Sequence, residues 1–289
     1  MPKKVFLFGS YNPFTFQPET TDYLTAIAVP NDSTVYYPST AQQIIGSAIW
    51  TALDTFVVSL KNAFSLTLGV NNLSTKFNAI YPMIGGTATA HKYNLVNPLD
   101  TNAAFRLTFS GGWTHAGTGA LPNGSNGYAD TYIVPSTNIA DRDNCHISYY
   151  SRTNKIGVAY VEMGVASPNA LFIAPYYDAT GAYRAVNSTQ VGPTATSINT
   201  ACFFQANRIT SSQAILYRNN SAIYTDTLFS GGLSTRNIYI GCYNTAGSPL
   251  YYTNRECSFA SAGIGMNGTE QTNYYNAIQS LQTSLFRQV

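Results

Sequence analysis

Charged side chains are scarce in this chain. Only 10% of its 289 residues are Asp, Glu, Lys or Arg, whereas roughly 25% is usual for a soluble domain. Hydrophobic residues still make up 45%, so the low charge does not indicate a disordered chain. A net charge of +2 with scattered basic residues argues against a nucleic-acid partner. Such a surface suits packing in an assembly or contact with carbohydrate, because little desolvation of charge opposes either.

Long apolar runs and closely spaced cysteines are also missing. No stretch approaches the roughly 18 apolar residues of a membrane span, and the 5–8 run is too short for a signal-peptide core. We therefore expect neither a membrane span nor a cleaved leader. Four cysteines lie far apart, without metal-ligand spacing: Cys145, Cys202, Cys242 and Cys257. We expect reduced, buried thiols, with one or two disulfides as the alternative.

Residues that would carry catalysis are isolated from one another. Glycoside hydrolysis needs two carboxylates facing each other across a cleft, but Glu162 stands alone beside a predicted strand. A lone strand glutamate is usually paired with an arginine or exposed. The three histidines lie on separate segments, without a carboxylate at a fixed offset: His91, His115 and His146. We therefore expect no enzymatic activity, no cofactor and no metal site.

The first two segments differ in local pattern. Residues 1–38, which include Pro13, Pro18, Pro30 and Pro38, predict an extended arm with one or two short strands. Such an arm lies on another subunit or wraps its own domain, and both interpretations are open. Residues 39–82 are predicted to be helical, with a long helix from about Ser39 to Asn62 and a weaker one over 70–77.

The long predicted helix carries an apolar stripe at three- and four-residue steps. A stripe of this kind is a packing face, either on the following domain or on a helix from a sister chain. We assign it to assembly, and a symmetric homo-oligomer would use it as an interface. The residues assigned to this assembly helix are Ile45, Ile49, Leu53, Phe56 and Leu60.

Residues 83–266 predict an antiparallel β-sandwich or jelly roll. Short β-prone runs recur at regular spacing, with Gly, Pro, Asn and Ser between them. One hairpin is clear, because Asn219 and Asn220 both tolerate a positive φ in a tight turn. The predicted strands cover residues 105–109, 147–150, 158–161, 170–175, 202–207, 214–218, 222–225 and 238–242.

Residues 267–289 predict a C-terminal helix that packs on the sandwich. Asn267 with Glu270 three positions later has the spacing of a capping box. Arg287 lies near the end of this segment, where the helix dipole favours a cation. The whole chain is therefore predicted to be dominated by β-structure, with one helix before the sandwich and one after it.

Several motifs resemble the concanavalin A-like, or laminin G-like, sandwich domain. They are the hairpin at 216–220, the strand 237–242 ending in Ile-Gly, and the segment 259–270 leading into a helix. Within this group the chain is most similar to virion proteins of tailed bacteriophages, on the motifs at 79–82, 85–88, 91–94, 111–115 and 285–289. Residues 1–38 match no part of that pattern.

The resemblance implies a structural virion component, such as a tail, fibre or capsid-decoration protein. Its expected partners are other virion proteins and copies of itself, and its expected location is the virion. The alternative hypothesis is a carbohydrate-binding module of the same fold, which would touch a glycan on the host surface. Both hypotheses predict a protein that binds other molecules and does not catalyse a reaction.

One Gly-rich stretch holds the residue types that sugar recognition needs, namely aromatic faces and planar polar groups on loops. Trp113 is open to a second interpretation as a core residue, and His115 to one as a partner of a loop carbonyl. The one carboxylate group that calcium could use combines Asp130 with Asp141 and Asp143. The candidate glycan residues are Trp113, His115, Asn123, Asn126, Tyr128 and Asp130.

Overall fold

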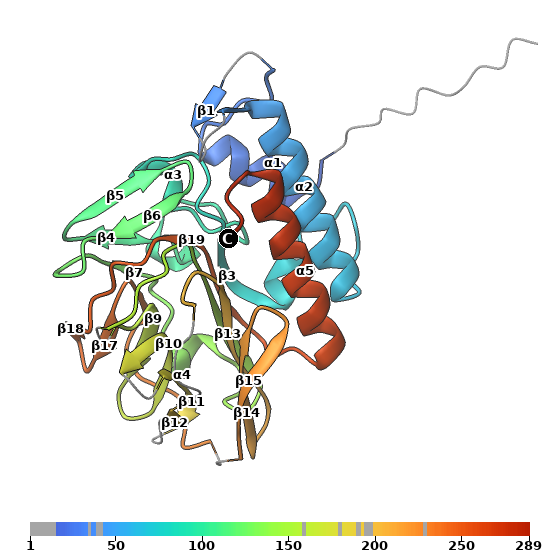
Figure 1. The fold of residues 1–289 in the computed structure, drawn as a ribbon. Coiled ribbons are helices and arrows are strands. Elements are labelled where there is room, and N and C mark those ends of the chain that lie inside the picture. The colour runs from blue at the N-terminus through green and yellow to red at the C-terminus, as the bar shows by residue number, and fades with distance from the viewer. Residues whose placement is uncertain are drawn as a thin grey trace, which may run out of the picture.

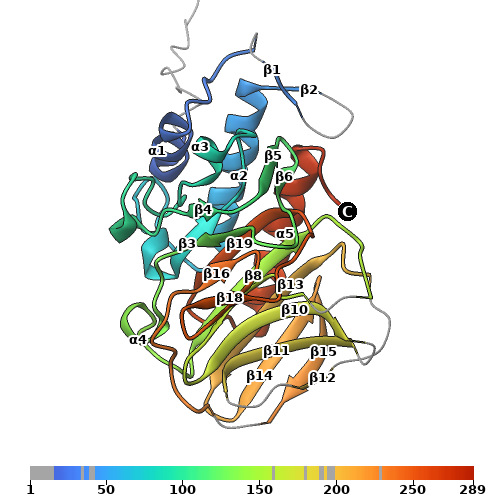
Figure 2. The same cartoon turned by 90° about the vertical axis from the view of Figure 1, so that its left-hand side faces the viewer.

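Three layers make up the fold: two facing β-sheets, and helices over the outer face of one sheet (Figure 1). The structure is a computed structural model that describes residues 16–33, 36–38, 43–157, 160–178, 181–188, 192–193, 199–227 and 230–289. Figure 2 looks onto the first sheet, here called sheet I, with the second, sheet II, and helices α2 and α5 behind it. The predicted β-sandwich is confirmed.

Sheet I has the strand order β12-β11-β10-β9-β16-β7-β4, with β17 paired to β9 and β18 paired to β17. Its neighbouring strands are antiparallel, whereas β17 runs parallel to β9. The strands are β4 (Thr108–Ser110), β7 (Tyr128–Asp130), β9 (Met163–Ala166), β10 (Ala170–Asp178), β11 (Gly181–Ser188), β12 (Gly192–Pro193), β16 (Tyr239–Ile240), β17 (Tyr243–Thr245) and β18 (Ser248–Leu250).

Sheet II has the order β15-β14-β13-β8-β19-β6-β5, with β3 paired to β19, and its pairs are antiparallel. A separate hairpin joins β1 (Tyr36–Pro38) to β2 (Gln43–Ile45). The strands of sheet II are β3 (Phe77–Tyr81), β5 (Trp113–Ala116), β6 (Gly119–Pro122), β8 (Cys145–Ser151), β13 (Phe203–Thr210), β14 (Gln213–Arg218), β15 (Ser221–Asp226) and β19 (Cys257–Gly263).

The central strands of sheet II are buried on both faces. Alternate residues of a strand point to opposite sides, so Ile147 and Tyr149 of β8 enter the core between the sheets. Tyr150 of β8 and Phe203 of β13 instead join the core beneath the helices. Two adjacent tyrosines such as Tyr149 and Tyr150 are therefore both buried, because one ring packs between the sheets and the other packs beneath the helices.

The apolar stripe of helix α2 (Gly46–Ala63) packs against residues of its own chain. The helix packs with α5 (Gly268–Ser284) over sheet II. Its stripe residues Ile49, Leu53, Phe56 and Leu60 are each at most 2% exposed and lie in the helix-side core. The assignment of this stripe to a sister chain is therefore wrong for these residues, and Ile45 ends the short strand β2 instead. The predicted start of this helix, at Ser39, lies outside the described residues.

Residues 18–26 form helix α1 (Pro18–Ala26), so the prediction of an extended arm is wrong there. Proline suits the first turn of a helix, where its missing N–H leaves no bond unmade. The buried Lys61 ammonium fixes α1 on α2, at 2.8 Å from Glu19 and 3.0 Å from Gln17 Oε1. Residues 1–15 and 34–35 of the predicted arm lie outside the described residues.

Other element boundaries differ from the predicted ones. The helix predicted over 70–77 is wrong: the chain forms a 3-10 turn (Leu73–Thr75) and then enters strand β3. A short apolar run does not by itself distinguish a helix from a strand. The strand predicted over 105–109 begins only at Thr108, since Phe105 is left-handed with a φ of 58°. Further short helices are η2 (Asn102–Ala104), α3 (Ala88–His91) and α4 (Pro135–Asn138).

Several local predictions are confirmed. The β14–β15 hairpin turns at Asn219, which adopts a φ of 54°. Asn267 and Glu270 form the capping box of α5. All four cysteines are free and buried. Arg287 differs from its prediction as a cation at the helix end: it lies beyond α5, and its buried guanidinium donates to the carbonyls of Pro82 and Met83.

None of the helices in the described part of the chain combines the length and apolarity needed to cross a membrane.

Candidate functional site

The outer face of sheet I presents paired tyrosines and a carboxylate. On β7, Ala129 enters the sandwich core, so Tyr128 and Asp130 point to the opposite face. On β16, Ile240 enters the core and Tyr239 points outward. Tyr239 lies directly opposite Asp130 in the strand pairing. The rings of Tyr128 and Tyr239 have centroids 4.8 Å apart and an angle of 31° between their planes.

Asp130 is the polar centre of this surface. The side-chain NH₂ of Asn237 donates to both carboxylate oxygens of Asp130, at 3.0 and 2.9 Å, and the Tyr132 backbone N–H donates at 2.8 Å. Burial raises the pKa of Asp130, and these bonds oppose the rise. Burial, followed by the charge of Asp130, raises the pKa of Tyr239 to about 12. The tyrosine is therefore a neutral O–H group at physiological pH.

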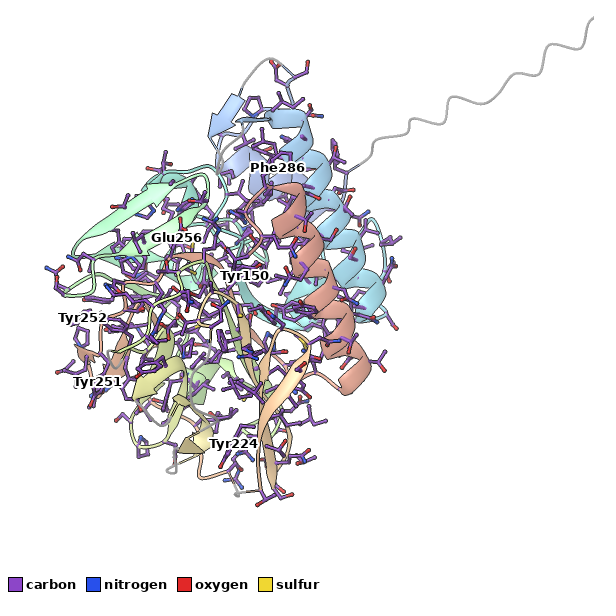
Figure 3. The ribbon with its side chains drawn as sticks, in the orientation of Figure 1. Tyr150, Tyr224, Tyr251, Tyr252, Glu256 and Phe286 are labelled. Carbon is purple, nitrogen blue, oxygen red and sulfur yellow. The ribbon has the colours of Figure 1, made fainter. Side chains whose placement is uncertain are left out.

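A further tyrosine extends the surface from the segment after β18. Tyr252 forms a bridge to Val161, and the pKa of Tyr252 is raised by burial first and then by Cys242 and Tyr128. Tyr252 therefore lies within electrostatic range of Tyr128. Figure 3 shows Tyr252 and its neighbour Tyr251 at the same edge of the molecule, beside β17 and β18. The tyrosine face is defined here as Tyr128, Asp130, Asn237, Tyr239 and Tyr252.

Trp113 supports this face from inside the sandwich. Its indole N–H donates to the carbonyls of Ser110 and Tyr128, at 3.1 and 3.2 Å, and its ring packs against the core between the sheets. A Cβ at Gly241 would lie 3.0 Å from the indole ring, so only glycine allows this close approach. The structure therefore favours the core interpretation of Trp113, which holds Tyr128 in place.

His115 is tied to a second histidine. Its Nδ1 lies 2.9 Å from His91 Nδ1, and its ring stacks on Trp113 with centroids 6.1 Å apart. His91 Nε2 accepts the Gly86 backbone N–H at 3.2 Å. This arrangement makes His91 the donor at Nδ1 and His115 the acceptor. The predicted loop-carbonyl partner of His115 is thus replaced by His91.

Asn123 and Asn126 shape the loop between β6 and β7. Asn123 Oδ1 accepts the backbone N–H groups of Ser125, Asn126 and Gly127, each at 3.0 Å. Asn126 Oδ1 accepts from the Asn123 side chain at 2.7 Å and from the Gly112 N–H at 3.0 Å. These bonds hold the loop that leads into β7, and both amide oxygens predicted for a glycan are used internally.

Neither the calcium group nor a catalytic role for Glu162 is supported. Among the described residues no three His, Cys, Asp or Glu side chains gather in a way that holds a metal. Asp141 and Asp143 share a turn instead, in which the Asp143 N–H donates to Asp141. Glu162 is fully buried and ion-paired with Arg255, which confirms the expectation for a lone strand glutamate.

The sequence prediction found Tyr128 and Asp130 but missed Asn237, Tyr239 and Tyr252. The sequence contains a pattern from which Asn237 and Tyr239 could have been found. In the run 237–240 the two isoleucines alternate with Asn and Tyr, which predicts a strand with the isoleucines buried and Asn237 and Tyr239 facing outward. Their proximity to Asp130 depends on the pairing of β16 with β7, which lies more than 100 residues earlier in the chain.

Solved structures resemble this fold at low sequence identity. A mutant of Trypanosoma rangeli sialidase that displays trans-sialidase activity matches with a TM-score of 0.52 and 10% identity, over 84% of this chain and 40% of the sialidase chain. A botulinum neurotoxin type C structure, concerned with two ganglioside molecules in cell entry, matches with a TM-score of 0.48 and 13% identity, over 72% of this chain and 52% of that chain.

Domain 4 of AbnA, an extracellular arabinanase from Geobacillus stearothermophilus, is similar in its complex with arabinotriose. The TM-score is 0.39 and the identity 13%, over 69% of this chain and 98% of that domain. At these identities the likeness concerns the fold alone, a β-sandwich. No protein-family model and no curated protein matches the chain.

Proposed function

We propose that the chain is a carbohydrate-binding module and that the tyrosine face is its binding surface. The observation that carries the proposal is the pairing of two tyrosine rings with a hydrogen-bonded Asp130–Asn237 couple on one outward face. Tyrosines supply large, rigid contact areas at low cost in conformational entropy. The sheet fixes both rings before a ligand arrives, so little ordering opposes binding.

The chemistry of the face suits a sugar ring. The C–H side of a pyranose is apolar and stacks on the aromatic faces of Tyr128 and Tyr239. The carboxylate of Asp130 accepts hydrogen bonds, and the free Oδ1 of Asn237 adds an acceptor beside it. Tyrosine hydroxyls both donate and accept, which matches the hydroxyls of a sugar. Binding without bond cleavage is proposed, because no other acid among the described side chains is recorded in contact with Asp130.

A glycan array followed by titration calorimetry tests the tyrosine face. Replacing Tyr239 by alanine removes one stacking ring and should weaken binding of an array-selected glycan at least about tenfold, the loss expected from roughly 1.4 kcal/mol. The control is Tyr224→Ala on β15, which is likewise half-buried and lies well apart from Tyr251 and Tyr252 in Figure 3. Equal affinity of the Tyr239 variant and the wild type would refute the site, as would an array without any bound glycan.

A virion assembly role is the second proposal, and it is compatible with the first. The observation that favours it is the low content of charged residues, 10%, since weakly charged surfaces pack with little desolvation cost. The location in a bacteriophage particle rests on the sequence resemblance. The buried α2 stripe cannot supply the interface, so a homo-oligomer would use another surface.

The assembly proposal predicts a homo-oligomer in solution. Light scattering coupled to size-exclusion chromatography of the purified chain should give a mass that is a multiple of 31.3 kDa. A stable monomer at 31.3 kDa over a wide concentration range would contradict self-assembly, and it would leave the glycan proposal untouched.

A further inference from the structure

A pocket separate from the tyrosine face shares none of its residues. It is a pocket of about 210 Å³ between the start of β3, the segment that follows α4, and the end of β19. The walls come from chain segments far apart in sequence, joined by a hydrogen bond from the Ile264 N–H to the Lys76 carbonyl at 2.9 Å. The polar lining side chains are Ser74, Lys76, Asn78, Asn138, Asp141 and Asn144.

The carboxamides around this pocket, here called the amide pocket, keep unused hydrogen-bonding groups. Asn78 donates from Nδ2 to the Asn138 carbonyl at 2.9 Å, which leaves its Oδ1 as an acceptor. Asn138 accepts the Val134 N–H at Oδ1 at 2.8 Å, which leaves its NH₂ as a donor. The Asn144 side chain forms no hydrogen bond within the described part of the chain, so both its donor and its acceptor are available.

The charges at the amide pocket disfavour an anion. Asp141 uses one oxygen to accept the Asp143 N–H at 2.8 Å and keeps the other. The Lys76 ammonium lies 3.4 Å from Glu270 and over the Phe64 ring, so its charge is already partly compensated. A neutral ligand that both donates and accepts hydrogen bonds fits this lining better than a phosphate or a carboxylate.

Apolar side chains complete the lining. The buried Phe77 and Ile139 contribute to the wall together with Ile264. The pocket volume of about 210 Å³ is large enough to hold several water molecules, and a single sugar ring is of that order of size. A sugar ring matches all three properties: it is neutral, its vicinal hydroxyls donate and accept, and its C–H edges are apolar.

We propose that the amide pocket binds one neutral sugar residue, with Asn78, Asn138, Asn144 and Asp141 addressing its hydroxyls. This is a second binding site, and it does not require the tyrosine face to bind glycan. A free sugar and the terminal residue of a glycan chain share the same ring chemistry. A chain that is held at its end here would leave the tyrosine face accessible.

Nuclear magnetic resonance with ¹⁵N-labelled protein tests this site through its side-chain amides. Titration with free glucose, galactose, mannose and N-acetylglucosamine should shift the NH₂ signals of Asn78, Asn138 and Asn144 for at least one sugar. A parallel titration with oligosaccharides ending in that sugar distinguishes the two sources. Shifts with oligosaccharides alone would assign the pocket to chain ends, and shifts with both would assign it to the free ring as well.

Variants make the proposal falsifiable. Asn144→Ala removes an amide that makes no internal bond, so the protein should fold and bind the sugar at least about fivefold more weakly. Asn144→Trp should fill the pocket and abolish binding. The control is Asn273→Ala, an exposed asparagine on α5. Unchanged affinity in both Asn144 variants, or no shift at the pocket amides with any sugar, would overturn the site even where the tyrosine face binds glycan.

Discussion

Replacing Glu162 by glutamine should lower the free energy of unfolding by about 3–5 kcal/mol. Glu162 and Arg255 form an ion pair in which both side chains are fully buried. Glu162 also accepts the Thr253 hydroxyl at 3.0 Å. Arg255 donates to the Lys155 carbonyl from Nε at 2.9 Å and from Nη2 at 2.6 Å, and its guanidinium lies 5.0 Å from the centre of the Tyr160 ring.

The loss is large because the substitution leaves a buried cation without its counter-charge. Glutamine keeps the shape of the side chain, so the effect reports charge rather than packing. Burial raises the pKa of Glu162, and the charge and hydrogen bond of Arg255, together with the Thr253 hydroxyl, oppose that rise. An isolated guanidinium in this interior has no comparable compensation.

Urea unfolding followed by circular dichroism measures this loss. The matched control is Asp100→Asn, which breaks an ion pair with Lys92 at the surface and should leave the unfolding midpoint nearly unchanged. A Glu162→Gln midpoint equal to that of the wild type would mean that the pair does not hold the sandwich together.

Acidification should destabilise the fold through two buried histidines. The Nδ1–H of His146 donates to the Ile264 carbonyl at 2.6 Å, while its Nε2 accepts the Ser261 hydroxyl at 3.0 Å. Both nitrogens are engaged in the neutral form, so an added proton has no acceptor without rearrangement. Burial lowers the pKa of His146 to about 4 and that of His91 to about 3.

The direction in which stability changes with pH follows from these lowered pKa values. A histidine whose folded pKa lies below the unfolded 6.5 stabilises the fold above pH 6.5, and that stability is lost as the pH falls toward the folded value. Each group contributes a slope of about 1.4 kcal/mol per pH unit below 6.5, so the two together should cost about 5 kcal/mol between pH 6.5 and 4.5. Asp130 and Glu162, whose pKa values are raised, act in the opposite direction.

Urea midpoints measured from pH 7 to pH 4.5 test this effect, and a variant isolates the histidine contribution. In His146→Gln the amide keeps a donor and an acceptor but does not titrate, so the acid slope should fall by about half, one of the two groups having been removed. Parallel pH profiles for the variant and the wild type would show that His146 does not control the acid response.

Local features were predictable because their causes lie within a few residues. The β14–β15 hairpin follows from the turn at Asn219, and the start of α5 follows from the Asn267–Glu270 capping box. Helix α1 does not follow from local pattern because a proline such as Pro18 is compatible with an extended chain and also with the first turn of a helix. Its position depends on a partner in α2, Lys61, which local pattern does not reveal.

The candidate site was only half predictable for a related reason. Tyr128 and Asp130 lie in one Gly-rich stretch, and their outward direction follows from strand alternation. Asn237 and Tyr239 join them only through the pairing of β16 with β7. Trp113 was ambiguous in sequence, because an indole is as useful in a core as on a binding surface. The close packing of Gly241 against the indole ring of Trp113 favours the interpretation of Trp113 as a core residue.

The most direct test of the tyrosine face is a backbone chemical-shift map of ¹⁵N-labelled protein titrated with an array-selected glycan. We predict that the largest shifts centre on β7 and β16, at Tyr128, Asp130 and Tyr239, with smaller ones at Tyr252. Shifts confined to the helices over sheet II, or spread evenly over the molecule, would contradict carbohydrate binding at this surface.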